Sequence, residues 1–319
     1  MRLENIASLF GISNIYEISE MKSGHINRTY LVTAASGRYI LQSLNREVFA
    51  CPNLVMENIS KIEEAFSKLK GSLVTVPHYL SAGSVNFLES DGEIWRMYGY
   101  MASEAHYGSN YYLIGISFGT FIKAINDTNM NLDAVIEDFH NFRKYYEKLM
   151  SIAPKRVELF SSLVNKIDTV FTKSLPVRNV HNDAKADNVI IGSRCTVIDL
   201  DTAMRGYAAL DYGDMIRSVC QKDVMDTTVL REVTRGFSKG LNGLLTNDEV
   251  NSLYYGIIWT VGELSMRYYI DGIEKKGYFK GKTPEDCIYR GDELYAQLCA
   301  FMERKEEICK IIGKEFFGS

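Results

Sequence analysis

The spacing of apolar residues predicts short, mixed elements in the first third of the chain. Apolar positions recur at helical spacing over residues 3–10, so a short amphipathic helix is predicted there. Runs rich in β-branched and aromatic residues at 30–32 and 38–41 predict two strands joined by a turn at 34–37. Residues 53–69 have the periodicity of a helix with one apolar side.

Two further strands are predicted near residues 78–83 and 93–100. The sequence Glu-Ser-Asp-Gly at 89–92 precedes the second strand and is typical of a hairpin turn. From about residue 111 helical periodicity dominates, interrupted only by short β-like runs between 178 and 200. The predicted helices are 112–125, 132–150, 157–171, 208–220, 226–244, 247–271 and 285–312.

These patterns predict an α+β protein of two lobes. Residues 1–101 form a small β-rich N-terminal lobe and residues 102–319 a large, mostly helical C-terminal lobe. The periodicity loosens between them, around Gly99, Ser103 and Gly108. The sequence contains five prolines, which suits long helices.

Composition and charge narrow the class of partner. The chain has 319 residues, 46% of them hydrophobic and 24% charged, with a formal net charge of -4. This acidic balance argues against a nucleic-acid partner, which would favour a basic surface. No apolar run reaches the length of a membrane-spanning helix, and the first residues do not resemble a signal peptide. Six scattered cysteines without a C-x-x-C pair predict free thiols in a reducing, cytoplasmic location and argue against a zinc site.

One segment carries the residue types that phosphoryl transfer requires. It contains His181-Asn182-Asp183-Ala184-Lys185-Ala186-Asp187-Asn188, followed by a predicted strand that ends in carboxylates. The transfer of a phosphoryl group to an alcohol depends on positioning and on neutralising charge. Asp183 is predicted to accept the hydroxyl proton, and Lys185 to reach the transferring phosphate. Asn188 and Asp199 are predicted to bind Mg²⁺ through oxygen atoms, which this ion prefers.

The alternative interpretation is that these are ordinary loop residues. Asp and Asn are common in turns because their side chains bond to nearby backbone, and an exposed loop lysine is unremarkable. The combination of D-x-K-x-x-N with Asp199 eleven residues later favours catalysis. His181 is predicted to hold the loop through hydrogen bonds, and Asp211 to cap a helix or fix the same loop.

This segment resembles the catalytic loop and metal-binding aspartate of the aminoglycoside phosphotransferase and choline kinase superfamily. That resemblance implies a bilobal, protein-kinase-like fold, ATP as phosphoryl donor and Mg²⁺ as cofactor. The superfamily usually has Gly where this chain has Asn182. The His-Asn-Asp variant is most similar to the N-acetylhexosamine 1-kinase branch, as are the segments 23–32, 39–45, 197–204 and 211–217.

The resemblance also implies a nucleotide site in the N-terminal lobe. Gly24, His25 and Asn27 lie in the predicted nucleotide-covering loop, where glycine permits close approach to a phosphate. Met97 and Gly99 lie in the strand that leads to the hinge, against which adenine binds in this superfamily.

Gln42 departs from the usual pattern. Most kinase-like enzymes place a lysine on this strand, paired with a glutamate of the next helix, to hold the phosphates. Gln42 can donate a hydrogen bond but brings no charge. Glu57 on the following predicted helix is the candidate to orient it, although an exposed helix glutamate would look the same in sequence.

The acceptor site is expected in the C-terminal lobe, facing Asp183. Its candidate residues offer the donors and acceptors that a sugar requires, although Arg and Lys on amphipathic helices are also common on solvated surfaces. They are Asp201, Arg267, Asp271, Lys280 and Arg290.

The sequence therefore predicts a small-molecule kinase of carbohydrate metabolism that phosphorylates the anomeric hydroxyl of an N-acetylhexosamine (GlcNAc or GalNAc). Choline, another amino alcohol or an aminoglycoside is the alternative acceptor. Residues 240–319 mix both signs of charge, which disfavours a polycationic aminoglycoside, whereas the 20 tyrosines keep a choline-binding aromatic cage open. A non-catalytic nucleotide-binding regulator is the alternative of another class, and Gln42 is its only support. The oligomeric state is not predicted.

Overall fold

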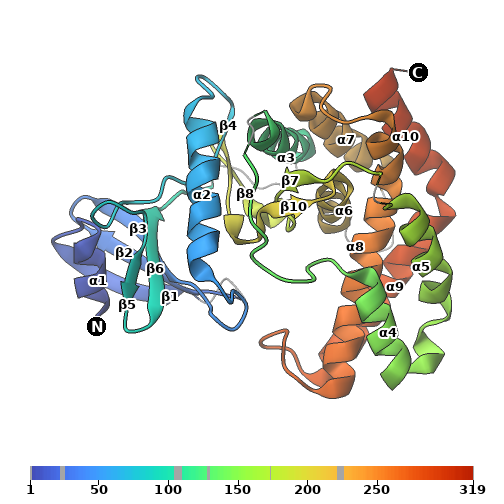
Figure 1. The fold of residues 1–319 in the computed structure, drawn as a ribbon, viewed down its shortest axis with the longest axis horizontal. Coiled ribbons are helices and arrows are strands. Elements are labelled where there is room, and N and C mark those ends of the chain that lie inside the picture. Colours follow the sequence, from blue (N-terminus) through green and yellow to red (C-terminus); the bar gives the residue numbers. More distant parts are fainter. Residues whose placement is uncertain are drawn as a thin grey trace.

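A five-stranded antiparallel sheet forms the N-terminal lobe (Figure 1). The computed structural model describes residues 2–21, 26–103, 110–127, 130–172, 174–220 and 226–318. Helix α1 (Leu3–Leu9) packs on one face of the sheet through Ile6 and Phe10. The strands, in spatial order, are β1 (Ile15–Met21), β2 (Arg28–Ala34), β3 (Gly37–Ser43), β6 (Glu93–Gly99) and β5 (Leu88–Ser90).

Most elements of this lobe agree with the sequence predictions, and one does not. The predicted strand at 78–83 is wrong, because this segment makes two isolated bridges, Tyr79 with Tyr98 and Ala82 with Val85, and no continuous ladder. The hairpin turn at Asp91 and Gly92 instead pairs β6 with the residues directly before the turn, which form β5. The tight turn pairs β5 with the start of β6, and the 78–83 segment meets β6 only beyond β5, at Tyr98.

Helix α2 (Pro52–Ser67) lies between the sheet and the helical part of the molecule (Figure 1). Its apolar side, with Val55, Met56 and Ile59, belongs to the core of the helical part. Asn58 donates hydrogen bonds to the carbonyl oxygens of Asp133 (2.9 Å) and Ala203 (3.0 Å). The division of the chain at residues 101 and 102 stays a prediction.

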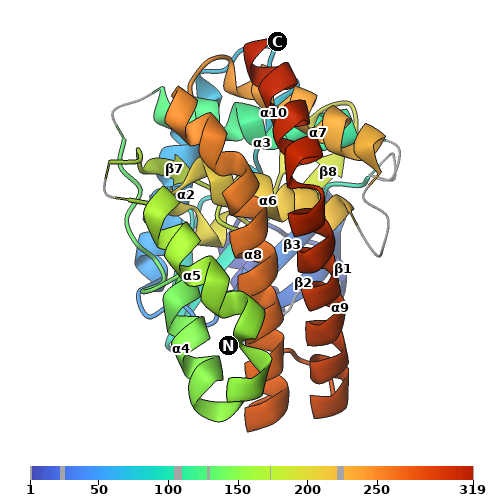
Figure 2. The same cartoon turned by 90° about the vertical axis from the view of Figure 1, so that its right-hand side faces the viewer.

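The C-terminal lobe is mostly helical, as predicted, and α8 and α9 run side by side along its length (Figure 2). The predicted helix at 132–150 is wrong in its first half, because Asp138 and His140 have positive φ (55° each), which an α-helix excludes. The predicted helix at 285–312 is two helices that meet at Arg304. The helices are α3 (Tyr111–Asn126), α4 (Phe142–Ile152), α5 (Glu158–Val170), α6 (Ala208–Val219), α7 (Thr227–Leu241), α8 (Asn247–Glu274), α9 (Pro284–Glu303) and α10 (Lys305–Phe317).

Short strands place two functional loops against each other. β7 (Arg178–Val180) pairs with β10 (Met204–Gly206) in one ribbon. β9 (Cys195–Val197) lies between β4 (Val74–Thr75) and β8 (Val189–Ile191) in the other sheet. The loop that follows β7 meets the loop that follows β9 through the hydrogen bond from His181 Nε2 to the carbonyl oxygen of Ile198 (2.9 Å).

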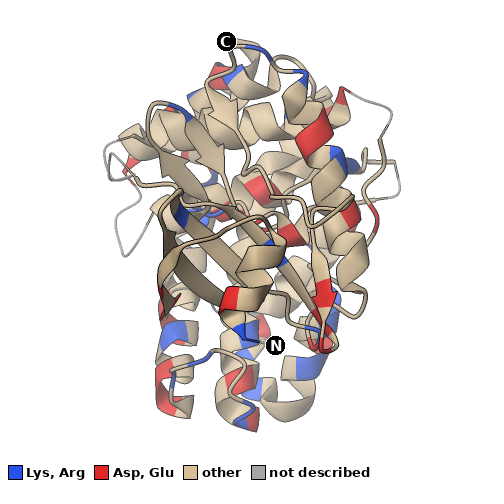
Figure 3. Cartoon of the chain, turned by 90° about the vertical axis from the view of Figure 1, so that its left-hand side faces the viewer, with Lys and Arg blue, Asp and Glu red and all other residues tan. Residues whose placement is uncertain are grey.

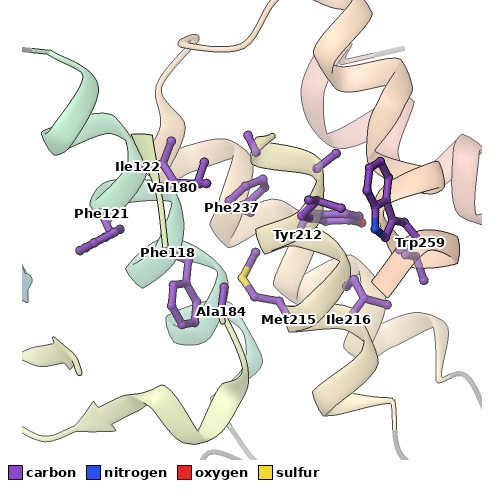
Figure 4. Packing of buried hydrophobic residues seen from close by; sticks show 14 of the residues in the cluster. Phe118, Phe121, Ile122, Val180, Ala184, Tyr212, Met215, Ile216, Phe237 and Trp259 are labelled. Atoms are coloured by element: carbon purple, nitrogen blue, oxygen red, sulfur yellow. The ribbon is translucent and has the colours of Figure 1, made fainter. Parts of the chain in front are cut away.

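The core beneath these loops is formed by α3, α6, α7 and α8. Phe118, Tyr212, Phe237 and Trp259 pack there from four different helices (Figure 4). α6 and α8 approach closely because glycines meet at their crossing, and a Cβ on Gly256 would lie 1.9 Å from the carbonyl oxygen of Ala209.

Three further features of the described residues concern apolar helices, the distribution of charge and the cysteines. None of the described helices is long and apolar enough to cross a membrane. Basic and acidic residues alternate over the face that the small lobe presents (Figure 3). All six cysteines are free thiols, as predicted, and the cytoplasmic location stays a prediction.

Gly256→Ala should destabilise the protein strongly, because the added methyl group meets backbone rather than a movable side chain. We expect a loss of about 3 kcal/mol, measured by urea unfolding. Gly313→Ala in α10 is the matched control, since nothing lies within 4 Å of its Cβ position. It should be neutral or stabilise by about 0.5–1 kcal/mol. Equal unfolding midpoints for the two variants would contradict the close contact of α6 and α8.

Candidate active site

The loop after β7 is held by a buried carboxylate. Asp211 of α6 is fully buried, and its two oxygens accept hydrogen bonds from the backbone N–H groups of His181 (2.8 Å) and Asn182 (2.7 Å). Of its two predicted roles, Asp211 therefore has that of fixing the loop. Burial raises the pKa of Asp211 to about 7, and the two backbone donors oppose that rise.

Asn182 has a left-handed backbone with φ of +63°. Glycine and asparagine are the residues that adopt this conformation most readily, which explains physically why Asn can stand where related loops have Gly. The Asn182 side-chain amide donates to the carbonyl oxygen of Thr202 at 3.2 Å. Asn182 thus ties the two functional loops together.

His181 also connects the two loops, in agreement with its predicted role. It is fully buried between the rings of Phe118 and Phe121. Its Nε2 donates to the carbonyl oxygen of Ile198 (2.9 Å), and its Nδ1 accepts from the backbone N–H of Asp183 (3.3 Å). Burial lowers its pKa, so the imidazole is neutral and structural.

Asp183, Lys185 and Asn188 meet at the mouth of this loop. The Asp183 carboxylate accepts hydrogen bonds from Lys185 Nζ (2.6 Å) and Asn188 Nδ2 (3.0 Å). Burial by itself would raise the pKa of Asp183, but the neighbouring lysine holds it below its usual range, so the carboxylate is ionised. Asn188 Nδ2 also donates to the Asp183 carbonyl oxygen (2.8 Å), which leaves the amide oxygen as its metal-ligating atom.

Asp199 lies on the second loop, directly after β9. The backbone φ of Asp199 is +61°. The backbone N–H of the preceding residue, Ile198, donates to the carbonyl oxygen of Asn188 (2.9 Å). Burial and the charges of Asp201 and Asp183 raise the pKa of Asp199 to about 7. Three carboxylates thus share a site with two cations, Lys185 and Arg96.

This excess of negative charge fits a divalent cation. Asp199 and the Asn188 amide supply the hard oxygen ligands that Mg²⁺ prefers, and this ion usually completes its shell with water and substrate phosphates. Within the described ranges no three His, Cys, Asp or Glu residues gather to hold a metal alone. A Mg²⁺ ion held jointly by protein and nucleotide is consistent with both observations.

A cavity of about 630 Å³ between the lobes contains these residues. It is lined by Asp183, Lys185, Asp187, Asn188 and Asp199 from the helical lobe. Asn27 and Gln42 line it from the N-terminal lobe, and their binding of nucleotide stays a prediction, whereas Gly24 and His25 lie outside the described residues. The remaining lining residues are Met21, Ile26, Thr29, Ile40, Tyr79, Arg96, Tyr98, Tyr100, Met101, Ile190 and Ile198.

The prediction for Met97 is wrong. Its side chain is fully buried against α1, on the face of β6 away from the cavity. Residues of a strand alternate between faces, so Tyr98 and Arg96 line the cavity instead. Gly99 is exposed, and Tyr100 and Met101 after it line the cavity in its place.

Arg96 is the functional residue that sequence reasoning missed. It is fully buried and donates to Gln42 Oε1 from Nε (3.0 Å) and Nη2 (2.8 Å). Gln42 Nε2 in turn donates to Thr29 Oγ1 (3.1 Å). Glu57 is exposed on α2, so Arg96 rather than Glu57 orients Gln42. The sequence feature that could have identified Arg96 is its position as a charged residue inside the apolar run Ile94-Trp95-Arg96-Met97.

Two of the predicted acceptor residues have other partners. Asp201 is buried and accepts hydrogen bonds from both Arg96 and Asn27, so its carboxylate serves the contact between the lobes. Asp271 is also buried and accepts from the backbone N–H groups of Tyr278 (2.9 Å) and Phe279 (3.1 Å). Asp271 therefore shapes the loop between α8 and α9, and both predictions of direct acceptor contact are corrected.

Arg267 lies one turn before Asp271, within an aromatic cluster. Its guanidinium is 5.7 Å from the ring centroid of Tyr145, 5.3 Å from Tyr278 and 6.0 Å from Phe279. Nη2 of Arg267 donates to the Tyr278 hydroxyl (2.8 Å). Of the other candidates, Lys280 is exposed, and Arg290 forms an ion pair with Glu293 (2.8 Å).

A second buried ion pair links α8 to the loop that follows β7. His140 Nε2 donates to the carbonyl oxygen of Asn182 (2.8 Å), and His140 Nδ1 donates to Glu263 (3.3 Å). The other oxygen of Glu263 accepts from Trp259 Nε1 (2.9 Å). Burial would lower the pKa of His140, but the Glu263 carboxylate outweighs it and raises the pKa to about 9.

Comparisons with known proteins agree with this geometry. The model of the phosphotransferase enzyme family matches residues 17–237, more than half of the chain. The fold is similar to that of a microcompartment-associated aminopropanol kinase, with a TM-score of 0.69 at 12% identity, covering 96% of this chain and 97% of that one. An ethanolamine kinase of Plasmodium vivax has a TM-score of 0.59 at 12% identity over 89% and 82% of the two chains.

A spectinomycin phosphotransferase, solved with ADP and spectinomycin, has a TM-score of 0.54 at 13% identity and covers 98% and 97% of the two chains. The predicted bilobal, protein-kinase-like fold is thereby confirmed.

The His140–Glu263 pair should make stability depend on pH. Unfolded histidine has a pKa of about 6.5, and in the folded protein the pKa of His140 rises to about 9. The pair's contribution is therefore complete below about pH 6.5 and is lost as the pH rises through about 9. In urea unfolding, we expect the difference between wild type and His140→Gln to shrink from pH 6 to about pH 10 by on the order of 2–3 kcal/mol.

His78→Gln is the matched control, because the His78 side chain is 87% exposed and pairs with Glu63 at the surface. It should follow the wild-type curve. A pH-independent difference between wild type and His140→Gln would contradict the charged pair.

Proposed function

The chain belongs to the phosphotransferase enzyme family, and we propose that it transfers the γ-phosphoryl group of ATP, with Mg²⁺, to the anomeric hydroxyl of an N-acetylhexosamine. The observation that carries this proposal is the convergence of Asp183, Asn188 and Asp199 on one cavity between the lobes. The spectinomycin enzyme of similar fold was solved with ADP, which supports ATP as the donor.

Asp183 is positioned to accept the proton of the acceptor hydroxyl as that oxygen attacks the γ-phosphorus in line. Its ionised state and its hydrogen bond from Asn188 orient the carboxylate for this role. Lys185, held at 2.6 Å from Asp183, brings the positive charge nearest to the attacking oxygen. Asn188 and Asp199 would hold Mg²⁺, which neutralises the charge of the transferring phosphates.

The aromatic cluster supports a neutral acceptor. Choline and amino alcohols are cations, and aromatic faces bind cations well only when those faces are free. Here Arg267 already lies over Tyr145, Tyr278 and Phe279. We place the acceptor beside this cluster, where the Arg267 guanidinium would repel a second cation and would donate hydrogen bonds to sugar hydroxyls or to an acetamido oxygen.

The alternatives have weaker support. Ethanolamine and aminopropanol kinases share the fold at 12% identity, which speaks for the fold and leaves the acceptor open. An aminoglycoside would meet the same guanidinium as choline. A non-catalytic regulator would have no need of an ionised Asp183 held by Lys185 and Asn188.

Asp183→Asn should lower kcat by about 10³-fold, within the range for loss of a general base. ATP binding, followed by titration with a fluorescent nucleotide, should change less than about threefold, because Asp183 faces the acceptor rather than the donor. Asp168→Asn, in an exposed ion pair with Arg143 on a distant helix, is the matched control. Turnover of Asp183→Asn near the wild-type rate would refute the role of base.

A panel of acceptors tests the substrate class. We expect ADP release with GlcNAc and GalNAc, and at least about 100-fold lower kcat/KM with choline, ethanolamine and kanamycin. Product analysis by ³¹P NMR should show a sugar 1-phosphate. Turnover confined to the cationic acceptors would refute the sugar kinase and establish the amino-alcohol alternative.

Arg267→Met provides the matching variant for this panel. It should raise KM for the sugar by about 10-fold or more and leave KM for ATP unchanged. If the variant gains activity with choline, the guanidinium is the element that excludes cationic acceptors.

A further inference from the structure

Gln42 and Arg96 are direct neighbours in the sheet. β3 and β6 pair antiparallel, and Gln42 lies opposite Arg96 in the register. Opposite residues of two paired strands point to the same face, so both side chains reach the interlobe cavity, which both of them line. A cation is therefore present at this point of the sheet, one strand away from the position where the sequence lacks a lysine.

The partner of this cation belongs to the other lobe. Arg96 and Asp201 are 1% and 2% exposed. Arg96 binds the carboxylate with both terminal nitrogens, and Nη2 lies 3.0 Å from Asp201 Oδ2. Asn27 Nδ2 donates to the same oxygen (2.6 Å), and Asn27 Oδ1 accepts from the backbone N–H of Asn45 (3.0 Å). A buried charge requires such complete pairing.

We propose that Arg96 is a positioning residue, which locks the small lobe onto the metal-binding loop in place of the lysine–glutamate pair of kinase-like enzymes. The proposal rests on the proposed phosphotransferase function. Arg96 acts through Asp201, which lies in the short helical turn Leu200–Thr202 that begins directly after Asp199. When Asp201 is held, the direction of the Asp199 carboxylate is held with it.

The charges favour positioning over direct phosphate binding. Asp201 neutralises Arg96, and the donors of Arg96 are directed at Gln42 and Asp201. A neutral pair attracts the phosphates far less than a free cation would. Bidentate geometry instead fixes orientation, which is the property a metal ligand requires from its neighbours.

Helix α2 takes no part in the contact between Arg96 and Asp201. Glu57 of α2 is exposed, and α2 is bound to the helical lobe independently through Asn58. The sheet of the small lobe is therefore joined to the helical lobe at Asp201, by residues of β6 and of the segment before β2, whereas α2 makes a contact of its own with that lobe.

The test measures Mg²⁺ and nucleotide binding as well as turnover, with Arg96→Met, Asp201→Asn, the double variant, and Gln42→Lys combined with Arg96→Met. For Arg96→Met we expect about a 10-fold higher Mg²⁺ requirement for nucleotide binding and about 100-fold lower kcat. KM for the acceptor should stay within about threefold.

Two comparisons separate positioning from a general loss of structure. Asp201→Asn should have the same profile as Arg96→Met, and the double variant should be no worse than the worse single variant, because each removes the same interaction. Gln42→Lys with Arg96→Met restores a cation on the neighbouring strand and should recover Mg²⁺ affinity at least threefold over Arg96→Met. Arg46→Met, which breaks an exposed pair with Glu89 (3.1 Å) in the same lobe, should match wild type.

Wild-type Mg²⁺ dependence of Arg96→Met, multiplicative losses in the double variant, or no recovery by Gln42→Lys would each overturn the proposal. If Arg96→Met does not fold, Arg96→Lys replaces it. Lysine keeps the charge without the bidentate contact, so an intermediate Mg²⁺ requirement supports the proposal and a wild-type value overturns it. Nucleotide and Mg²⁺ titrations need no acceptor. They would therefore still test the role of Arg96 if the sugar-kinase proposal failed.

Discussion

The active site depends on one buried carboxylate at the start of α6. Asp211 holds the backbone of His181 and Asn182, and through them the loop that carries Asp183. His181 then holds Ile198, so the Asp199 loop follows the same anchor. The anchor is stiff because α6 lies against α8 at a glycine crossing that permits no movement toward α8. Close packing of α6 against α8 in the helical core thus fixes the position of Asp183, the proposed base, although the packed residues themselves lie away from the cavity.

The electrostatics of the cleft follow from the same crowding. Asp183, Asp199 and Asp201 are gathered in a partly buried site where water screens them less than at the surface, and Lys185 and Arg96 offset only part of their charge. Burial, together with this imbalance, raises the pKa of Asp199 to about 7. A divalent cation would neutralise the excess negative charge. This excess is therefore itself an argument for a metal-dependent reaction. Arg96 and Asp201 neutralise each other, so they hold the lobes together without competing for the phosphates.

In the helical lobe, the residues that connect the loop of Asp183 with the aromatic cluster come from one helix, α8. Trp259, Glu263, Arg267 and Asp271 succeed one another at four-residue intervals, so they lie along one side of the helix. Glu263 reaches the catalytic loop through His140, Asp271 holds the loop between α8 and α9, and Arg267 fills the aromatic cluster between them. A single helix thereby connects the loop of Asp183, the proposed base, with the aromatic cluster proposed to bind the acceptor.

The sequence by itself determined the elements with regular periodicity and which of the proposed catalytic residues lie close together along the chain. Asp183, Lys185 and Asn188 span six positions, so a single loop brings them together whatever the rest of the fold does. Only the tertiary structure decided which residues meet across the lobes. Asn27 and Asp201 are 174 positions apart, Arg96 faces Gln42 because of strand register, and Met97 turns away because of alternation along β6. These contacts depend on pairing and packing between distant segments, which local periodicity does not encode.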